Sequence, residues 1–362
     1  MKRRVVVAMS GGVDSSVAAA LLLKAGFEVV GMTMCFNLAD AARKKPSCCG
    51  AQGIEDASRT AHKLGIKHYV INMQRPLQEY IIKDFVNEYL SGRTPNPCVR
   101  CNQFLKFDIL LSKAISLDAR YLATGHYARL EKSKSKKSED SPAYLLKKAK
   151  DKNKDQSYFL YRLNQYQMRH TLFPLGEYTK SEVRAVARRL GLTVADKVAS
   201  QEICFLPEQD YRHFLKNQIK KAIQPGHILN NKGVIIGEHK GIPFYTIGQR
   251  QGLGIALGHP VYVSRMEAQA NRIFVGSRKE LLKREFLVED AHFIRQPIKK
   301  KVALRVRIRY NHKEAPAVIE VLSDAIKVVF KTPQFAIAPG QSAVFYERDY
   351  VVGGGIIKEV LG

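Results

Sequence analysis

A glycine-rich turn lies between a short β-branched run at residues 4–9 and a helical pattern at residues 13–25. The turn, residues 10–16, reads SGGVDSS. Paired glycines allow a tight turn that exposes backbone N–H groups, and the helix N-terminus adds free donors and partial positive charge. The turn therefore predicts an anion-binding nest at the start of an α/β domain. It matches neither the Walker A pattern nor G-x-G-x-x-G.

The sequence around this turn is typical of an α/β domain, which we expect at residues 1–205. Apolar runs alternate with helical patterns, and this alternation predicts a parallel sheet covered on both faces. The expected strands lie at residues 4–9, 28–35, 68–72 and 121–124, and the main expected helices at residues 13–25, 54–64, 77–90, 102–116 and 179–190. Residues 131–154 interrupt the pattern with a lysine-rich insertion, for which we expect hairpin character near residues 143–146.

The sequence changes in character after residue 205. Glycine and proline become more frequent, and short alternating runs replace the helical patterns. We expect a small central domain of mixed structure at residues 206–278 and a C-terminal β-barrel at residues 279–362.

The chain is strongly basic. Lys and Arg total 59 against 33 Asp and Glu, which gives a net charge of +26. A folded chain with this charge is expected to meet a polyanion. Since no apolar run approaches the ~20 residues that a membrane helix needs, we expect a cytoplasmic protein with a nucleic-acid partner and no membrane contact.

One strand pattern places positive charge on a single face. Residues 302–310 read VALRVRIRY, so strand alternation puts Arg305, Arg307 and Arg309 opposite the apolar side chains. Such a row is either a solvated edge that charge protects from aggregation, or a surface for phosphates. The net charge favours the second interpretation, with the three arginines pointing outward.

Six cysteines are present, and three of them lie in distinctive contexts. Residues 92–102 read GRTPNPCVRCN and contain Cys98 and Cys101, and residues 200–205 read SQEICF and contain Cys204. We expect Cys101 at the start of a helix, where the dipole favours a thiolate. C-x-x-C alone fits a redox pair, half a metal site or chance, and the lack of a second pair disfavours zinc. No role is assigned to the remaining cysteines, Cys35, Cys48 and Cys49.

The turn at residues 10–15 resembles the pyrophosphate loop of the N-type ATP pyrophosphatases, whose domain is adenine nucleotide alpha hydrolase-like. The cysteine motifs are more specific, and together they resemble the tRNA-specific 2-thiouridylases of the MnmA/TrmU family. Residues 154–160, KDQSYFL, and residues 248–254, GQRQGLG, match that family too. The resemblance runs essentially from end to end.

The resemblance implies a tRNA-uridine 2-sulfurtransferase that modifies the wobble uridine of tRNA. ATP adenylates the C2 carbonyl oxygen, and sulfur then displaces AMP. The residue matching Cys204 would carry a persulfide received from a sulfur-relay protein or cysteine desulfurase. Cys101 would be the partner nucleophile that releases the sulfur and ends in a Cys101–Cys204 disulfide.

The same resemblance assigns the binding residues. ATP would contact Ala8, Met9, Ser10, Gly11, Gly12, Val13, Asp14, Ser15, Met34 and Gly125. tRNA would contact Asn96, Pro97, Cys98, His126, Lys154, Asp155, Gln156, Arg309, Tyr310 and Gln341. From its place in the turn, Asp14 would either cap the following helix or help to hold a Mg²⁺ ion beside the phosphates.

Cys98 departs from the family pattern, in which many members carry Asp at this position. Cys98, Cys101 and Cys204 are three thiolates, enough to hold a [4Fe–4S] cluster with one open iron. The persulfide and the cluster-bound hydrosulfide therefore remain alternatives. Two other functions stay open as well: an ATP-pyrophosphatase-type ligase or amidotransferase acting on a small metabolite, and a non-catalytic RNA-binding protein.

Overall fold

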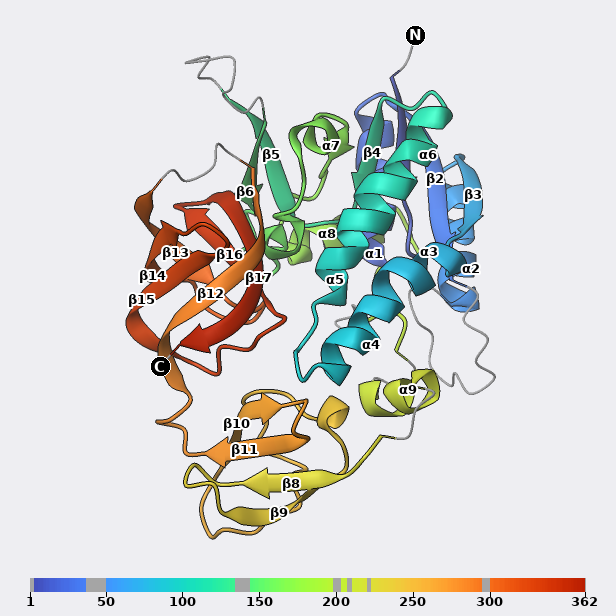
Figure 1. The fold of residues 1–362 in the computed structure, drawn as a ribbon. Helices are drawn as coiled ribbons and strands as arrows, with labels where there is room; N and C mark the ends of the chain where they lie inside the picture. Colours follow the sequence, from blue (N-terminus) through green and yellow to red (C-terminus); the bar gives the residue numbers. More distant parts are fainter. Residues whose placement is uncertain are drawn as a thin grey trace.

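The computed structural model describes residues 3–36, 50–133, 144–197, 203–206, 210–219, 223–294 and 300–361. Cys48 and Cys49 lie outside these residues. The chain forms an α/β domain, a small central sheet and a β-barrel (Figure 1). This is the three-part fold class expected from the sequence. No helix in the described part of the chain has the length and apolarity that a membrane crossing requires.

The N-terminal domain is built on a parallel sheet in the order β3-β2-β1-β4-β7. Its strands are β1 (Arg4–Ala8), β2 (Glu28–Cys35), β3 (Lys67–Asn72), β4 (Tyr121–Thr124) and β7 (Thr171–Leu172). The chain moves outward from β1 to β3 and then returns to place β4 on the other side of β1. Ligands of such sheets bind at this switch point, outside the carboxyl ends of the strands.

The sheet has an apolar core on each face, and a different group of helices packs into each core. The core containing Val5 and Val7 of β1 includes side chains of α1 (Val13–Lys24), α2 (Ala51–Lys63) and α8 (Lys180–Arg189). The core containing Val6 includes side chains from a chain of helical segments. These segments are the π-helix η1 (Leu77–Ile82), α4 (Lys83–Leu90), α5 (Pro97–Arg100), the π-helix η2 (Cys101–Leu110) and α6 (Leu111–Ser116). The short helix α3 (Gln74–Pro76) precedes them and has no buried residue. Neighbouring β1 residues thus point to opposite faces, as strand geometry requires.

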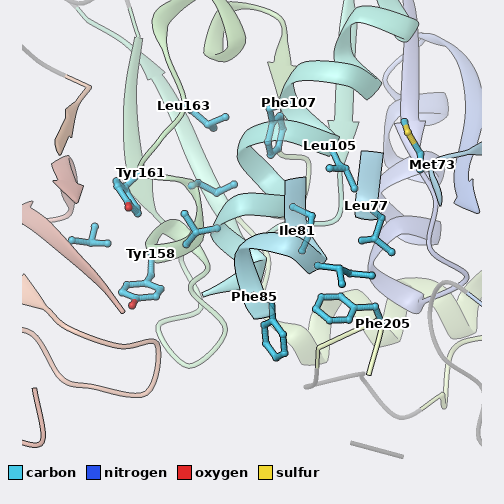
Figure 2. Close-up of a cluster of buried hydrophobic side chains, with 14 of the residues drawn as sticks. Met73, Leu77, Ile81, Phe85, Leu105, Phe107, Tyr158, Tyr161, Leu163 and Phe205 are labelled. Carbon is cyan, nitrogen blue, oxygen red and sulfur yellow. The ribbon is translucent and has the colours of Figure 1, made fainter. Parts of the chain in front are cut away.

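The second core continues into the central domain. Figure 2 shows Leu77, Ile81, Phe85 and Leu105 packed together, with Phe205 beside Phe85. The central elements are α9 (Tyr211–Gln218), β8 (Gly226–Leu229), β9 (Ile235–His239), the 3₁₀ turn η5 (Ile242–Phe244), β10 (Tyr262–Glu267) and β11 (Arg272–Gly276), and the sheet order is β10-β11-β8-β9.

Six antiparallel strands close into the C-terminal barrel by pairing β12 with β17. They are β12 (Leu282–Phe293), β13 (Lys301–Arg307), β14 (Ala315–Val321), β15 (Ile326–Phe335), β16 (Ser342–Glu347) and β17 (Tyr350–Leu361). The lysine-rich insertion forms the ends of a hairpin, β5 (Ala128–Lys132) with β6 (Tyr144–Lys148), and β6 pairs with β17. The remaining short elements are η3 (Ser157–Leu160) and α7 (Gln165–Arg169).

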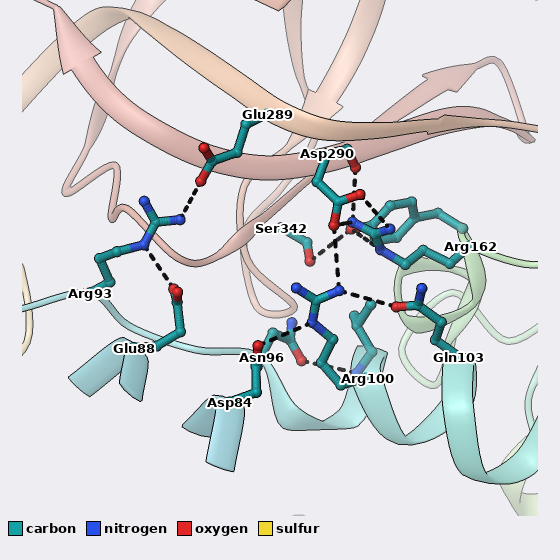
Figure 3. A network of polar contacts seen from close by, with 12 residues as sticks. Asp84, Glu88, Arg93, Asn96, Arg100, Gln103, Arg162, Glu289, Asp290 and Ser342 are labelled. Carbon is teal, nitrogen blue, oxygen red and sulfur yellow. Dashed lines mark hydrogen bonds and ion pairs between the residues drawn. The ribbon is translucent and has the colours of Figure 1, made fainter. Parts of the chain in front are cut away.

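Ion pairs join the barrel to the helices that carry the C-x-x-C motif (Figure 3). Arg93 bridges Glu88 at 2.8 Å and Glu289 of β12 at 2.6 Å. Asp290 of β12 accepts from Arg162 at 2.6 Å and from Arg100 at 3.4 Å. Residues 93–100 are therefore held between two domains.

Candidate active site

A cavity of about 310 Å³ lies at the carboxyl ends of β1, β2 and β4, at the switch point of the sheet. Residues expected to bind ATP and residues expected to meet the base or carry sulfur line it together. The expected residues in its wall are Ala8, Met9, Ser10, Gly11, Gly12, Val13, Asp14, Ser15, Met34, Pro97, Cys98, Cys101, Gly125, His126, Gln156 and Cys204. Lys106 and Lys197 also line it, although the sequence predicted a role for neither.

The glycine turn leaves the start of α1 available to an anion. Gly12 occupies the N-cap position in an extended conformation, with no side chain capping this described helix. The Ser15 and Ser16 hydroxyls donate back to the Gly12 carbonyl at 3.2 and 2.9 Å. Residues of the first helical turn line the cavity, and the N–H groups at the start of a helix lack partners within the helix, which is how helix N-termini bind phosphate.

Asp14 does not cap α1, so that alternative was wrong. Its carboxylate accepts from the Tyr127 hydroxyl at 2.7 Å and from the Lys180 ammonium at 2.6 and 2.7 Å. Burial, together with the Asp14 charge, raises the pKa of Tyr127 above its ordinary value, so Tyr127 is a proton donor at neutral pH. Asp14 is the one carboxylate in the described cavity wall, and Lys180 engages both of its oxygens. The wall therefore does not fit a Mg²⁺ ion held by protein carboxylates.

Lys197 supports the same turn through a second set of contacts. Its ammonium donates to Asp56 of α2 at 2.6 Å and to the Gly11 carbonyl at 3.2 Å. Gly11 itself has φ +70°, and a Cβ there would lie 2.2 Å from the Gly53 carbonyl oxygen. The turn is thus packed against α2 and fixed by two lysines from distant parts of the chain.

The helix that bears the cysteines begins earlier than the sequence predicted. The Asn96 side chain accepts from the Val99 N–H, and α5 starts at Pro97. Cys98, rather than Cys101, therefore lies in the first turn, where the helix dipole acts. Local capping chemistry causes the shift, because Asn followed by Pro is a strong start signal. Cys101 begins the π-helix that follows.

Cys204 reaches the cavity because the next residue is anchored in the core. Phe205 is buried, and its ring packs edge-on against Phe85, with centroids 5.4 Å apart, and at the same distance from Phe214. Cys101 and Cys204 thus line one cavity with the phosphate-binding turn.

The iron–sulfur alternative gains no support from the described residues. Within the described residues, no group of three His, Cys, Asp or Glu side chains is placed to hold a metal ion, and Cys98, Cys101 and Cys204 are all among those residues.

His126 is a buried, neutral side chain at the end of β4. Its Nδ1 is 2.7 Å from the Thr124 hydroxyl. Burial, and to a smaller degree the charge of Lys106, holds the pKa of His126 well below its ordinary value. The preceding Gly125 packs so closely on α1 that a Cβ would lie 2.8 Å from the Ser15 nitrogen. His126 therefore lies next to the phosphate-binding turn as a polar group without charge.

His126→Gln is expected to reduce the loss of stability in mild acid. Below pH 6.5 the unfolded wild-type chain gains a proton on His126, whereas the native state does not, so stability falls as the pH falls. Removing this group should reduce the fall in the free energy of unfolding between pH 7 and 5.5 by about 1 kcal/mol. Urea unfolding of both proteins at each pH measures the difference. The same pH dependence of the unfolding free energy in both proteins would contradict a neutral His126 in the native state.

The other residues expected to contact tRNA lie outside the cavity. Asp155 is buried, and its carboxylate accepts from the Ala149 N–H and the Ser157 hydroxyl at 3.1 and 2.9 Å. Gln341 donates to the carbonyls of Thr94 and Pro95, and thereby fixes the loop that precedes Asn96. Lys154 lies in the turn before Asp155, half-buried.

The prediction that three arginines point outward in a row was wrong in part. Arg305 is exposed, but Arg307 is largely buried and pairs with Asp155 at 3.4 Å. Arg309 donates to the Phe335 carbonyl at 3.0 Å, and Tyr310 packs on Phe159 with ring centroids 4.6 Å apart. The strand alternates as expected, but residues 155–159 cover part of its polar face.

A parallel sheet with a glycine turn of this kind at its switch point defines a nucleotide-binding domain of the ATP pyrophosphatase class. Three family models match the chain: "tRNA methyl transferase HUP domain" at residues 3–208, "tRNA methyl transferase PRC-barrel domain" at 212–277 and "Aminomethyltransferase beta-barrel domain" at 283–357. The chain belongs to the family of the tRNA-specific 2-thiouridylases MnmA.

Two relatives illustrate this membership. The tRNA-specific 2-thiouridylase MnmA of Acetivibrio thermocellus is 48% identical over 362 residues, 99% of both chains. That of Carboxydothermus hydrogenoformans is 46% identical over 365 residues, again 99% of both. Among solved structures, the U34-tRNA thiolase NcsA of Methanococcus maripaludis with its [4Fe-4S] cluster matches at TM-score 0.35 and 18% identity, covering 60% of this chain and 64% of that one. A similarity this distant carries no information on the cysteine chemistry.

Proposed function

We propose that the protein is an ATP-dependent sulfurtransferase that converts C2 of the wobble uridine of tRNA from a carbonyl to a thiocarbonyl. The observation that carries the proposal is one cavity lined by a phosphate-binding turn and by Cys101 and Cys204. Full-length similarity to tRNA-specific 2-thiouridylases supports the same reaction.

In the first step, ATP activates the base. The turn at residues 10–15 binds the phosphates through backbone N–H groups, and Mg²⁺ enters with the phosphates as part of the substrate. The uridine O2 attacks the α-phosphorus, the bond to pyrophosphate breaks, and the N3 proton leaves to solvent. The C2 oxygen becomes part of AMP, a much better leaving group than an oxide.

In the second step, sulfur replaces that oxygen. The terminal sulfur of a Cys204 persulfide attacks C2, the C2–O bond breaks, and AMP leaves with the electron pair. The Cys101 thiolate then attacks the Cys204 sulfur of the adduct, which releases 2-thiouridine and leaves a Cys101–Cys204 disulfide. A thiol reductant restores the pair, and a cysteine desulfurase or a sulfur-relay protein supplies the next persulfide.

The barrel and the cavity would act on one tRNA together. Gln341 of the barrel holds the carbonyls of Thr94 and Pro95, which directly precede the proposed base pocket at residues 96–98. A basic chain of net charge +26 favours RNA phosphates as the contact. The wobble base lies in a loop, so moving it into the cavity costs less than extracting a paired base.

Mass spectrometry of tRNA nucleosides tests the function. The protein is incubated with tRNA, ATP, Mg²⁺, a reductant and a persulfide donor, anaerobically, with and without added iron. We expect 2-thiouridine and AMP in equal amounts, with no requirement for iron. ATP cleavage without thiolated nucleoside would indicate a ligase or amidotransferase, and no ATP turnover would indicate a non-catalytic RNA-binding protein. A strict requirement for iron would instead support the alternative in which an iron–sulfur cluster carries the sulfur.

A further inference from the structure

Among the described residues of the cavity wall, Lys106 is a lysine whose side chain has no partner. Asp14, His126 and Lys197 also line the cavity, and each has a hydrogen-bonded partner. The side-chain ammonium of Lys106 has no hydrogen bond or ion pair with any residue that the structure describes. It is half-buried, and a partly desolvated ammonium beside a cavity is a strong anchor for an anion.

Helix geometry places Lys106 on the same side as Cys101. Residues 101–110 form a π-helix, in which hydrogen bonds run from residue i to i+5 and each turn is wider than in an α-helix. Residues five apart therefore lie on nearly the same face, whereas in an α-helix they diverge. Both side chains line the cavity as a result. Such segments are frequent at functional sites.

Lys106 also acts on the phosphate end of the cavity. Its charge lowers the pKa of His126, so the two side chains are close enough to interact electrostatically. His126 follows Gly125, which packs on the Ser15 backbone at the start of α1. Lys106 therefore lines the same cavity as the phosphate-binding turn and Cys101, the cavity in which the activated C2–O–phosphate group would form.

We propose that Lys106 is a catalytic residue of the sulfur-transfer step, whose ammonium contacts the phosphate of the adenylated base and stabilises AMP as it departs. The inference rests on the function proposed above. When sulfur attacks C2, the C2–O bond breaks and its electron pair moves onto the AMP oxygen. The fixed positive charge offsets that negative charge without transferring a proton. Preorganised charges of this kind typically contribute a factor of about 100 to 1,000 in rate.

The test separates the two steps in single turnovers, with ATP labelled at the α-phosphorus and a persulfide donor. Lys106→Met should form labelled, adenylated tRNA within about fivefold of the wild-type rate, and should make 2-thiouridine about 100 to 1,000 times more slowly. Lys106→Arg should recover most of the lost rate. Lys113→Met, an exposed lysine of α6 on the same helical stretch, is the matched control and should behave as wild type.

The outcomes are distinct. Accumulation of adenylated tRNA by Lys106→Met supports the proposal, and it also shows that the variant is folded. Wild-type thiolation by Lys106→Met would overturn the proposal. Equal losses of adenylation and thiolation would overturn it too, because the lysine would then serve nucleotide binding or folding. A wild-type protein that makes no 2-thiouridine would refute the underlying function, whatever the variants do.

Discussion

Replacing Cys204 with serine is expected to reduce 2-thiouridine formation by more than about 1,000-fold, because a hydroxyl cannot carry the transferable sulfur. Adenylation should survive, since it needs only the phosphate-binding turn and the base. The variant should therefore release about one equivalent of pyrophosphate per enzyme and retain adenylated tRNA. Pyrophosphate release measures adenylation, and nucleoside mass spectrometry of the same sample measures thiolation.

Two further variants make this result specific. Cys101→Ser should stop one step later, with tRNA joined to Cys204 through a disulfide that an added thiol cleaves, so a denaturing gel should show a reductant-sensitive adduct. Cys35→Ser is the matched control, because Cys35 ends β2 and is not part of the cavity wall. Thiolation by Cys204→Ser at the Cys35→Ser rate would remove Cys204 from the mechanism.

Local features of the site were predictable from the sequence because their determinants are local. The turn at residues 10–16 needs only two glycines between a strand and a helix, and the strands at residues 28–35 and 121–124 match the structure. The T-x-x-E pattern at residues 179–182 likewise predicts the capping box of α8, in which Thr179 and Glu182 each bond the other's backbone N–H. Such features depend on neighbours within a few residues.

Features that depend on distant neighbours could not be predicted in the same way. Lys180 lies 166 residues from Asp14 along the chain, so nothing near Asp14 indicates that a cation neutralises it. The alternation of β13 predicts two faces but not that Asp155 covers Arg307 on one of them. Lys106 lines the cavity together with Cys101 because residues 101–110 form a π-helix, whereas the sequence pattern implied an α-helix.

The contacts between domains also depend on distant neighbours and could not be predicted from the sequence. The sequence marks residues 131–154 as an insertion in the catalytic domain, but strand β6 of that insertion pairs with β17 of the barrel, and Lys148 donates its N–H to the Asp349 carbonyl at 2.9 Å. The ion pairs of Arg93 and Asp290 add a second connection (Figure 3). If the barrel binds the tRNA as proposed, these contacts fix the cavity walls relative to the bound tRNA.

Gly11→Ala is expected to lower ATP use with tRNA by about 100-fold or more. Gly11 has φ +70°, which costs an L-residue about 1–2 kcal/mol, and the added Cβ would meet the Gly53 carbonyl oxygen at 2.2 Å. The turn must move away from α2, and the N–H groups that bind phosphate move with it. A displacement of about 1 Å at a reacting group is enough for a loss of this size.

Gly65→Ala separates strain from displacement. Gly65 has φ +66°, nearly that of Gly11, but nothing lies within 4 Å of its Cβ position. Both variants should therefore share the conformational cost in urea unfolding, and only Gly11→Ala should lose AMP formation and ATP binding. If the two lose the same stability and both keep AMP formation, the contact with Gly53 does not position the turn, and the phosphate site has a different basis.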